Sequence, residues 1–247
     1  MSRPDVEVTP ASHALPKWRR ALLTVATLAP MDLLDLSTGD VVLVLGAHPD
    51  DETFGVAGTI ASLAASGVDV HVVSMSAGEA ALDHVGVTVA HLAAQRRHEL
   101  ASACAVLGTA SDTMRHYPDG RLAEFENGMA ADIAAVAHRH GARRLLTVAW
   151  CEPHPDHAAV GRATLEAGAR LGIPVTGYVV WALHWTDPDD PVMRKTPMTL
   201  MSLDARASAA RHAAISCYRT QTEPLDAGVA AILPPSFVGN DLELLVG

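Results

Sequence analysis

The sequence has few aromatic residues, few cysteines and no long apolar run. Aromatic residues make up only 4% of the 247 residues although 49% are hydrophobic, so the core is predicted to consist of aliphatic helices packed on a β-sheet. The three cysteines, Cys104, Cys151 and Cys217, form no Cys-x-x-Cys pair and are odd in number. This excludes a disulfide framework and favours a reducing compartment. No run approaches the roughly 20 apolar residues that span a bilayer, so we expect no transmembrane segment.

Positive charge is scarce as well. Lys and Arg number 18 against 28 Asp and Glu, for a formal net charge of -10. Such a chain has no broad electrostatic surface for nucleic acid or an anionic membrane, so we expect neither as a partner. Residues 17–28 resemble a signal peptide only in part, because Pro30 and Asp32 soon interrupt the apolar run. We therefore predict a leader region with an amphipathic helix at residues 1–36, and a cytoplasmic location.

From Asp40 onward, apolar runs alternate with stretches of helical spacing. The apolar runs predict strands at residues 41–47, 68–75, 144–149 and 174–183. Helical spacing predicts helices at 53–66, 89–107, 125–140 and 158–171, and a last helix capped by Asp204 that runs to about Arg219. This alternation indicates βα units around a mostly parallel sheet. The predicted fold class is α/β, a Rossmann-like three-layer sandwich that forms a single domain over residues 37–247.

Two groups of histidine and carboxylate residues follow predicted strands. The chain has 13 histidines, and the motif HPDDE, residues 48–52, comes directly after the strand at 41–47. The motif CEPHPDH, residues 151–157, comes just after the strand at 144–149. Because parallel strands of one sheet bring their carboxyl ends to the same edge, we expect the two motifs to converge on one site.

The residue types in these motifs suit a catalytic metal ion. Imidazole and carboxylate bind borderline divalent ions, and two histidines with one aspartate leave a position open for water. We assign His48, Asp51 and His157 as ligands, because residues i and i+3 can turn inward together across the bend at Pro49. Zn²⁺ is the expected ion, and Fe²⁺ accepts the same ligands. Asp50 is then left over, and a carboxylate beside an activated water is predicted to be the general base.

Two further residues have predicted roles, and each motif also has a simpler interpretation. His154 is expected to stabilise the oxyanion or to protonate the leaving amine, and Asp156 to orient one of the histidines.

Alternatively, each motif alone could be an Asx turn or an N-cap of the helix that follows. The occurrence of both motifs after apolar strands favours the metal site.

The pattern resembles the PIG-L or LmbE-like family of GlcNAc-phosphatidylinositol and mycothiol-pathway deacetylases. The resemblance rests on AHPDDE at residues 47–52 and HPDH at residues 154–157, and it covers about residues 41–172. It implies that residues 37–247 are an LmbE-like metal hydrolase domain. The implied activity is zinc- or iron-dependent removal of acetyl groups from N-acetylglucosamine-type amines, and the implied partner is a small amino-sugar or glycoconjugate substrate.

The resemblance also implies substrate contacts. Arg96 begins an R-x-x-E-L pattern and matches the family's substrate-binding arginine, although a solvated helix face is the alternative. Asp119 in YPDG matches a sugar-hydroxyl acceptor, although a simple turn explains it almost as well. The chain departs from the family at Glu152, where some members carry a tyrosine that helps the oxyanion. Glu152 is expected either to point away or to bind an amine or hydroxyl of the substrate. The segment 181–185 is either a stacking wall or packing of an edge strand.

Other functions stay open at this stage. The same metal and base could cleave another amide, such as an acyl group on a glycosylated natural product or on a thiol-sugar conjugate. A non-hydrolytic nucleotide-binding module is disfavoured, because GAHPDDETFG lacks G-x-G-x-x-G and places carboxylates where phosphates would approach. A metallophosphoesterase with two metal ions would need more ligands than these motifs supply.

Overall fold

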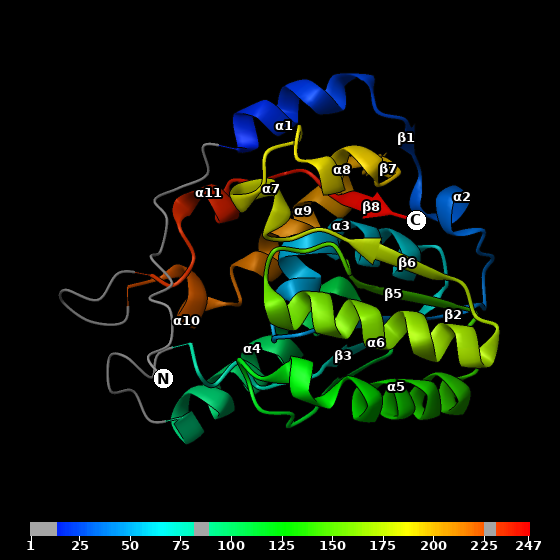
Figure 1. Cartoon of the computed structure of the whole chain (residues 1–247), viewed down its shortest axis with the longest axis vertical. Helices are drawn as coiled ribbons and strands as arrows, with labels where there is room; N and C mark the ends of the chain where they lie inside the picture. The colour runs from blue at the N-terminus through cyan, green and yellow to red at the C-terminus, as the bar shows by residue number, and fades with distance from the viewer. Residues whose placement is uncertain (1–13, 82–88, 225–230) are drawn as a thin grey trace.

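The predicted βα alternation is present in the computed structural model, which describes residues 14–81, 89–224 and 231–247. In these residues eight strands form one sheet in the order β1-β7-β8-β6-β5-β2-β3-β4 (Figure 1). All neighbouring strands are parallel except where β8 pairs with β6 and β7. The strands are β1 (Thr27–Leu28), β2 (Val41–Gly46), β3 (Asp69–Ser74), β4 (Ser111–Met114), β5 (Arg144–Val148), β6 (Val175–Tyr178), β7 (Met198–Met201) and β8 (Leu244–Val246).

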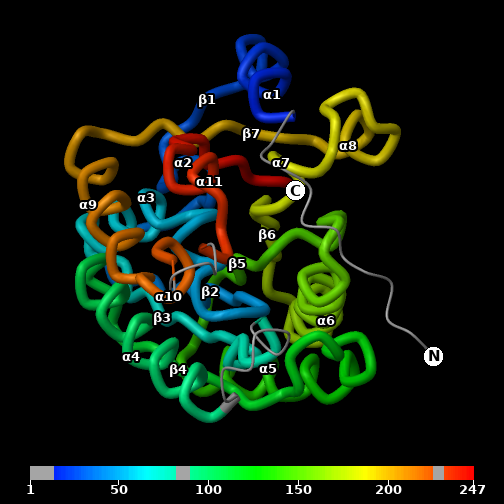
Figure 2. The backbone as a smooth tube through the Cα atoms, turned by 90° about the vertical axis from the view of Figure 1, so that its left-hand side faces the viewer, coloured from blue at the N-terminus to red at the C-terminus, as the bar shows by residue number. Residues whose placement is uncertain are grey.

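Helices cover both faces of this sheet. Helices α3, α4 and α9 pack together on one face, and α5 and α6 pack on the other, as Figure 2 shows edge-on. The main helices are α3 (Asp51–Ala65), α4 (Val89–Leu107), α5 (Glu126–His140), α6 (Pro155–Leu171) and α9 (Ala205–Ile215). Shorter helices are α7 (Ala182–Trp185), α8 (Pro191–Lys195), α10 (Arg219–Thr222), α11 (Pro235–Val238) and the 3-10 helix η3 (Leu122–Phe125). The predicted three-layer α/β sandwich with a mostly parallel sheet is therefore confirmed.

The central strands are buried because helices cover both of their faces. Residues 42–46 of β2 and residues 145–148 of β5 are buried without interruption, as expected for parallel strands between two helical layers. Strand β2 pairs with β3 on one side and with β5 on the other. The loops that follow β2 and β5 therefore meet at the same edge of the sheet, where open α/β sheets place their ligands.

The described part of the leader region joins the rest of the chain. It contains α1 (Leu15–Ala21), the 3-10 helix η1 (Leu22–Thr24), β1 and α2 (Pro30–Leu34), and β1 pairs with β7 as the first strand of the sheet. Trp18 of α1 is 3% exposed, and its Nε1 donates to the carbonyl of Thr186 at 2.8 Å. The boundary at residue 36 stays a prediction, and residues 1–13 lie outside the described part.

Several predicted boundaries need correction. Helix α3 begins at Asp51 and α6 begins at Pro155, earlier than predicted, so both histidine motifs lie at helix N-termini. The strand predicted at 174–183 ends at Tyr178, and α7 follows at Ala182 because the Glu152 carboxylate accepts the backbone N–H groups of residues 180–182. Asp204 does cap α9 through Ala207 N, but that helix ends at Ile215.

Among the described residues, each helix is too short or too polar to cross a bilayer.

Candidate metal centre and active site

Three predicted ligands meet where the loops after β2 and β5 adjoin. Potential ligand atoms of His48, Asp51 and His157 all lie within 4.8 Å of one another. Nδ1 of His48 is 3.8 Å from Asp51 Oδ2, and Nε2 of His157 is 3.1 Å from Asp51 Oδ1. His157 is fully buried, yet neither of its ring nitrogens, Nδ1 or Nε2, has a hydrogen-bond partner of good geometry among the described residues. A buried nitrogen of this kind costs free energy unless a further group binds it, so the residues present fit a metal ion.

Asp51 is held by backbone hydrogen bonds to one of its oxygens, while the other oxygen faces His157. Its Oδ2 accepts hydrogen bonds from the backbone N–H groups of Ala47 and His48 at 2.8 and 3.0 Å. Burial opposes ionisation of Asp51, but the His157 and His48 rings outweigh it and hold the pKa well below the ordinary value. The carboxylate is therefore charged, and its Oδ1 is available to bind a metal ion.

The second nitrogen of His48 contacts two carboxylates. His48 Nε2 lies 3.0 Å from Asp119 Oδ1 and 3.4 Å from Asp156 Oδ2. Burial lowers the pKa of His48, but Asp119 and Asp156 raise it well above the ordinary value. Without an ion this ring is therefore protonated on both nitrogens. An ion beside Asp51 would replace the Nδ1 proton, while the Nε2 proton stays directed at these carboxylates. Asp119 thus lies against His48, and its Oδ2 accepts the backbone N–H of Ala80 at 2.8 Å.

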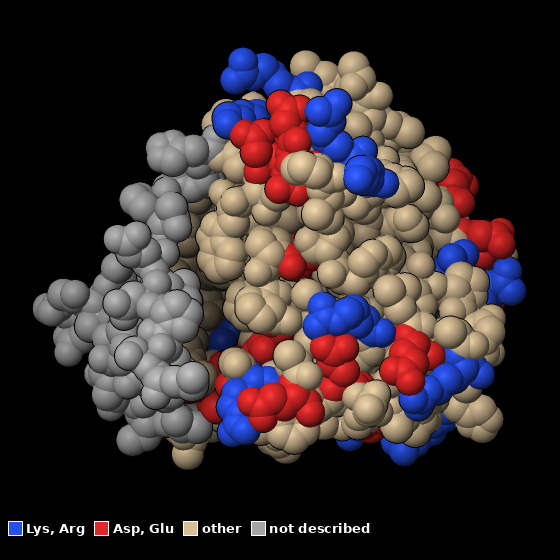
Figure 3. Space-filling model, viewed as in Figure 1, with Lys and Arg blue, Asp and Glu red and all other residues tan. Residues whose placement is uncertain are grey.

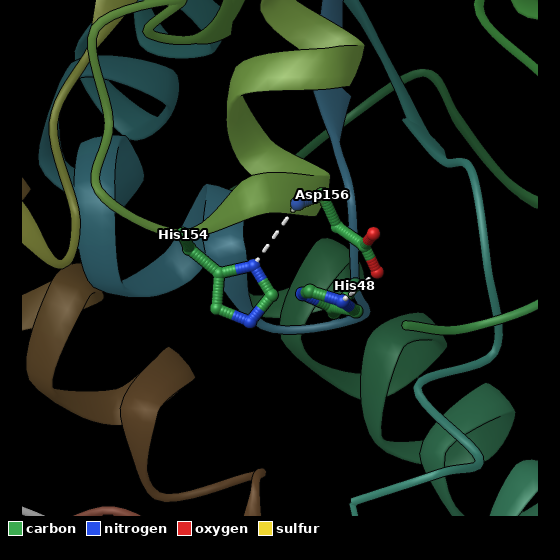
Figure 4. Close-up of side chains that lie close together, drawn as sticks. All are labelled: His48, His154 and Asp156. Atoms are coloured by element: carbon green, nitrogen blue, oxygen red, sulfur yellow. Dashed lines mark hydrogen bonds and ion pairs between the residues drawn. The ribbon is translucent and has the colours of Figure 1, made fainter. Parts of the chain in front are cut away.

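A second group of possible ligands shares His48. Figure 4 shows His154 and Asp156 extending from the start of α6 towards His48, and potential ligand atoms of these three residues also lie within 4.8 Å of one another. Both oxygens of Asp156 already accept backbone hydrogen bonds, from Gly120 N at 2.7 Å and Leu122 N at 3.0 Å. His154 Nδ1 accepts the Asp156 N–H at 3.2 Å. These contacts make the second group the poorer metal site.

Asp50 has an unusual backbone and a buried charge partner. It occupies the N-cap position of α3 with φ of 131°, a conformation that costs energy for any residue but glycine and that is concentrated at functional sites. Its Oδ2 lies 2.8 Å from Arg96 Nη2, and Asp50 as a whole is 7% exposed. Burial raises the pKa of Asp50 to about 7, although the Arg96 guanidinium acts to lower it. A carboxylate with this pKa can exchange a proton near neutral pH.

Arg96 lies inside the protein and not on a solvated helix face. It is 3% exposed, and besides Asp50 it donates to the carbonyls of Pro49 at 2.6 Å and Gly78 at 3.0 Å. Gly78 has φ of +62°, and a Cβ there would come within 2.0 Å of Arg96 Nη1. Position 78 must therefore be glycine for Arg96 to reach Asp50.

His154 adjoins both the ligands and an aromatic cluster. Its ring centroid is 4.7 Å from that of His157, and its plane is tilted by only 18° from that of Trp185. Burial lowers the pKa of His154 to about 3, with His157 and His48 adding to the effect. The ring is neutral, and because Nδ1 accepts the Asp156 N–H, its proton lies on Nε2.

Glu152 has a role that the sequence analysis missed. Its side chain is fully buried, and Oε2 lies 3.3 Å from His157 Nδ1. Its oxygens also accept the N–H groups of Val180, Trp181 and Ala182 at 2.9 to 3.0 Å. Burial lowers the pKa of His157, but Asp51 and Glu152 outweigh it and raise that pKa to about 9. Of the two expectations for Glu152, the structure shows the one in which it points away from the substrate side and contacts the proposed ligand.

Residues 43–168 match the family model described as PIG-L: GlcNAc-PI de-N-acetylase. The chain belongs to the PIG-L family. The resemblance predicted from HPDDE and HPDH is thereby confirmed.

Curated relatives of this PIG-L chain are named as deacetylases. The 1D-myo-inositol 2-acetamido-2-deoxy-alpha-D-glucopyranoside deacetylase of Rhodococcus opacus is 44% identical over 178 residues, 59% of this chain and 60% of that protein. A probable N-acetyl-alpha-D-glucosaminyl L-malate deacetylase 2 of Bacillus cereus is 33% identical over 141 residues, 53% of this chain and 61% of that protein. The matched part is thus about 60% of the length of these relatives.

Solved structures share the fold of the PIG-L chain. The zinc-inhibited form of a teicoplanin deacetylase superposes with a TM-score of 0.67 at 16% identity, over 83% of this chain and 97% of that one. At such identity the likeness shows the fold alone.

Proposed function

We propose that this PIG-L protein is a metal-dependent hydrolase that removes an acetyl group from the amine of an N-acetylglucosamine-type conjugate. One observation carries the proposal: His48, Asp51 and His157 converge beside Asp50, a carboxylate that is not committed as a ligand and is paired with Arg96. The names of the curated relatives support the acetyl-sugar chemistry.

We assign the metal to His48, Asp51 and His157. The donor set of two imidazoles and one carboxylate suits Zn²⁺, and Fe²⁺ accepts the same set. When bound, such an ion supplies Lewis-acid polarisation of the carbonyl and of a water molecule. Asp119 and Asp156 orient His48, and Glu152 orients His157, so that each ring presents one nitrogen to the site.

The chain's own groups carry the proton transfers. Asp50 accepts a proton from the attacking water, because its carboxylate lies beside the ligands and Arg96 fixes its Oδ2. The proton held on Asp50 can then pass to the leaving amine. His154 offers an Nε2–H donor, so it stabilises the carbonyl oxygen as negative charge develops. This geometry favours the oxyanion role of His154 over protonation of the amine.

Sugar contacts by Arg96 and Asp119 stay predictions. The hydrogen bonds of these residues give each a second role, since Arg96 orients Asp50 and Asp119 orients His48.

The nucleotide-binding alternative stays disfavoured. Asp50 and Asp51 lie at the N-terminus of α3, where a phosphate group would have to bind. On the face in Figure 3, basic side chains of the described residues lie in small groups mixed with acidic ones, without a broad basic area.

The proposal is tested by acetate and free-amine release from N-acetylglucosamine and a panel of its conjugates. The full chain is stripped of metal and reloaded with Zn²⁺ or Fe²⁺. We expect release from at least one conjugate only after reloading. Stoichiometric metal binding without release from any conjugate would reject the acetyl-sugar assignment and leave the metal site standing.

A further inference from the structure

We propose that Trp185, backed by Trp181, is a ring-stacking subsite beside the reacting amide. The substrate would then carry a second uncharged ring next to its N-acyl amino sugar, either an aryl aglycone or another pyranose. Both present an apolar ring face of the kind that stacks on indole. This inference rests on the proposed deacetylase function and names the substrate class of the same site.

Trp185 lies beside His154, close to the proposed metal ligands. The ring centroid of Trp185 lies 6.3 Å from that of His154, and the two planes differ by 18°. The His154 ring in turn lies 4.7 Å from that of His157, a proposed metal ligand. The His154 side chain therefore lies between Trp185 and the proposed ligand His157. A ring stacked on Trp185 would be next to the sugar whose acetyl group is removed.

Trp185 is also exposed to solvent. Trp185 is 40% exposed, whereas its backing partner Trp181 is half-buried with its ring centroid 4.1 Å away. Tryptophan has a large apolar surface, and aromatic residues are concentrated where proteins bind ligands. An exposed indole beside a candidate active site is thus available for stacking.

The short helix that carries these rings is fixed from several sides. A helix of four residues is not stable alone, but Glu152 accepts three N–H groups at the start of α7. Trp18 Nε1 donates to the carbonyl of Ala182, the first residue of α7, and to that of Thr186, which follows its last residue. Phe237 packs edge-on against Trp181, with ring centroids 4.4 Å apart. The indole is preorganised, so binding loses little side-chain freedom.

The charges near the site favour an uncharged ring. Arg96 is already paired with Asp50, and the carboxylates around the site outnumber the positive charges of Arg96 and a divalent ion together. These carboxylates are Asp50, Asp51, Asp119, Asp156 and Glu152. An anionic substituent would meet repulsion there and no free partner among these groups. The expected neighbour of the N-acyl sugar is therefore a neutral ring.

The test compares the methyl glycoside of N-acetylglucosamine with its phenyl glycoside and with diacetylchitobiose, on the full chain loaded with Zn²⁺. We expect kcat/KM for at least one ring-bearing substrate to exceed that of the methyl glycoside by about fivefold, mainly through KM. The phenyl and disaccharide arms identify which ring is used. In Trp185→Ala and in Trp185→Leu this ratio falls towards one, and Trp185→Phe keeps most of it.

Leu165→Ala is the matched control, because Leu165 is 37% exposed on α6 and should leave the ratio unchanged. Equal kcat/KM for all substrates in the parent protein, or an unchanged ratio in both Trp185→Ala and Trp185→Leu, would overturn the subsite. If no compound is hydrolysed, binding is measured by saturation-transfer NMR. If the phenyl glycoside or diacetylchitobiose binds the parent and binding is lost in the Trp185 variants, the subsite is upheld and deacetylation is rejected. If binding is the same in the parent and in the Trp185 variants, the subsite is overturned as well.

Discussion

The guanidinium of Arg96 and the carboxylate of Asp50 meet inside the protein, with Arg96 Nη2 2.8 Å from Asp50 Oδ2. Burial raises the pKa of Asp50 to about 7, and Arg96 acts against that rise. The pair therefore places the proposed base where it can accept a proton at neutral pH and return it within one turnover.

Replacing Arg96 should shift the pH dependence of activity. Asp50 must be ionised to act as base, and Arg96→Gln removes the charge that lowers its pKa. The acidic limb of the pH profile of kcat/KM should move to higher pH by about one unit. Arg97→Gln is the matched control, since Arg97 lies next along α4 and pairs with Asp112. An acidic limb that stays in place in Arg96→Gln would show that Asp50 is not the group that sets it.

Metal content distinguishes the two groups of possible ligands. Asp51→Asn removes a proposed ligand, so stoichiometric Zn²⁺ binding should be lost. Asp156→Asn alters a carboxylate whose oxygens already accept backbone N–H groups, so the ion should stay bound with weakened affinity. Inductively coupled plasma mass spectrometry after dialysis reports both. The reverse pattern would assign the ion to His48, His154 and Asp156.

Glu152 should control metal affinity without touching the ion. Glu152→Gln replaces the carboxylate beside His157 Nδ1 with an amide, which should weaken Zn²⁺ binding by about 10- to 100-fold. Chelator competition measures this change, and Glu166→Gln on the exposed part of α6 is its control. A lower unfolding midpoint with unchanged metal affinity would show that Glu152 only supports the chain at residues 180–182.

His184 should make the protein sensitive to acid. It is 6% exposed and stacks on Phe237, and burial lowers its pKa to about 4. In the unfolded chain the pKa is about 6.5, so the unfolded state binds more protons between these values and stability falls as pH decreases through them. Between about pH 7.5 and pH 5, the parent should lose about 2 kcal/mol of unfolding free energy more than His184→Phe loses.

Urea unfolding at the two pH values measures this difference between the two proteins. Equal losses in both would mean that folding does not lower the pKa of His184.

Elements that are determined by the local sequence pattern could be predicted from the sequence. The apolar run of β2 and the helical spacing of α4 predicted both elements closely, and α4 has the predicted bounds. The convergence of His48 with His157 was also predictable, because parallel strands bring their carboxyl ends together. Even the simpler capping interpretation holds in part, since His154 accepts the Asp156 N–H at the start of α6.

Features that depend on distant partners were not predictable. Residues 179–183 have the composition of a strand, but Glu152 takes the N–H groups that a strand would use, and α7 forms instead. The contact of Asp119 with His48 joins residues far apart in sequence. The short β8 pairs antiparallel between β6 and β7, and this pairing depends on strands that lie far from it in sequence.

The most direct test of the account is the Asp50→Asn variant loaded with Zn²⁺. We predict that it binds the ion stoichiometrically, as the parent does, and that kcat for acetate release falls by about 10²- to 10⁴-fold. Asp132→Asn, in a half-buried pair with Arg115 outside the proposed site, should leave both quantities unchanged. Full activity in Asp50→Asn with the ion bound would contradict the assignment of Asp50 as the base.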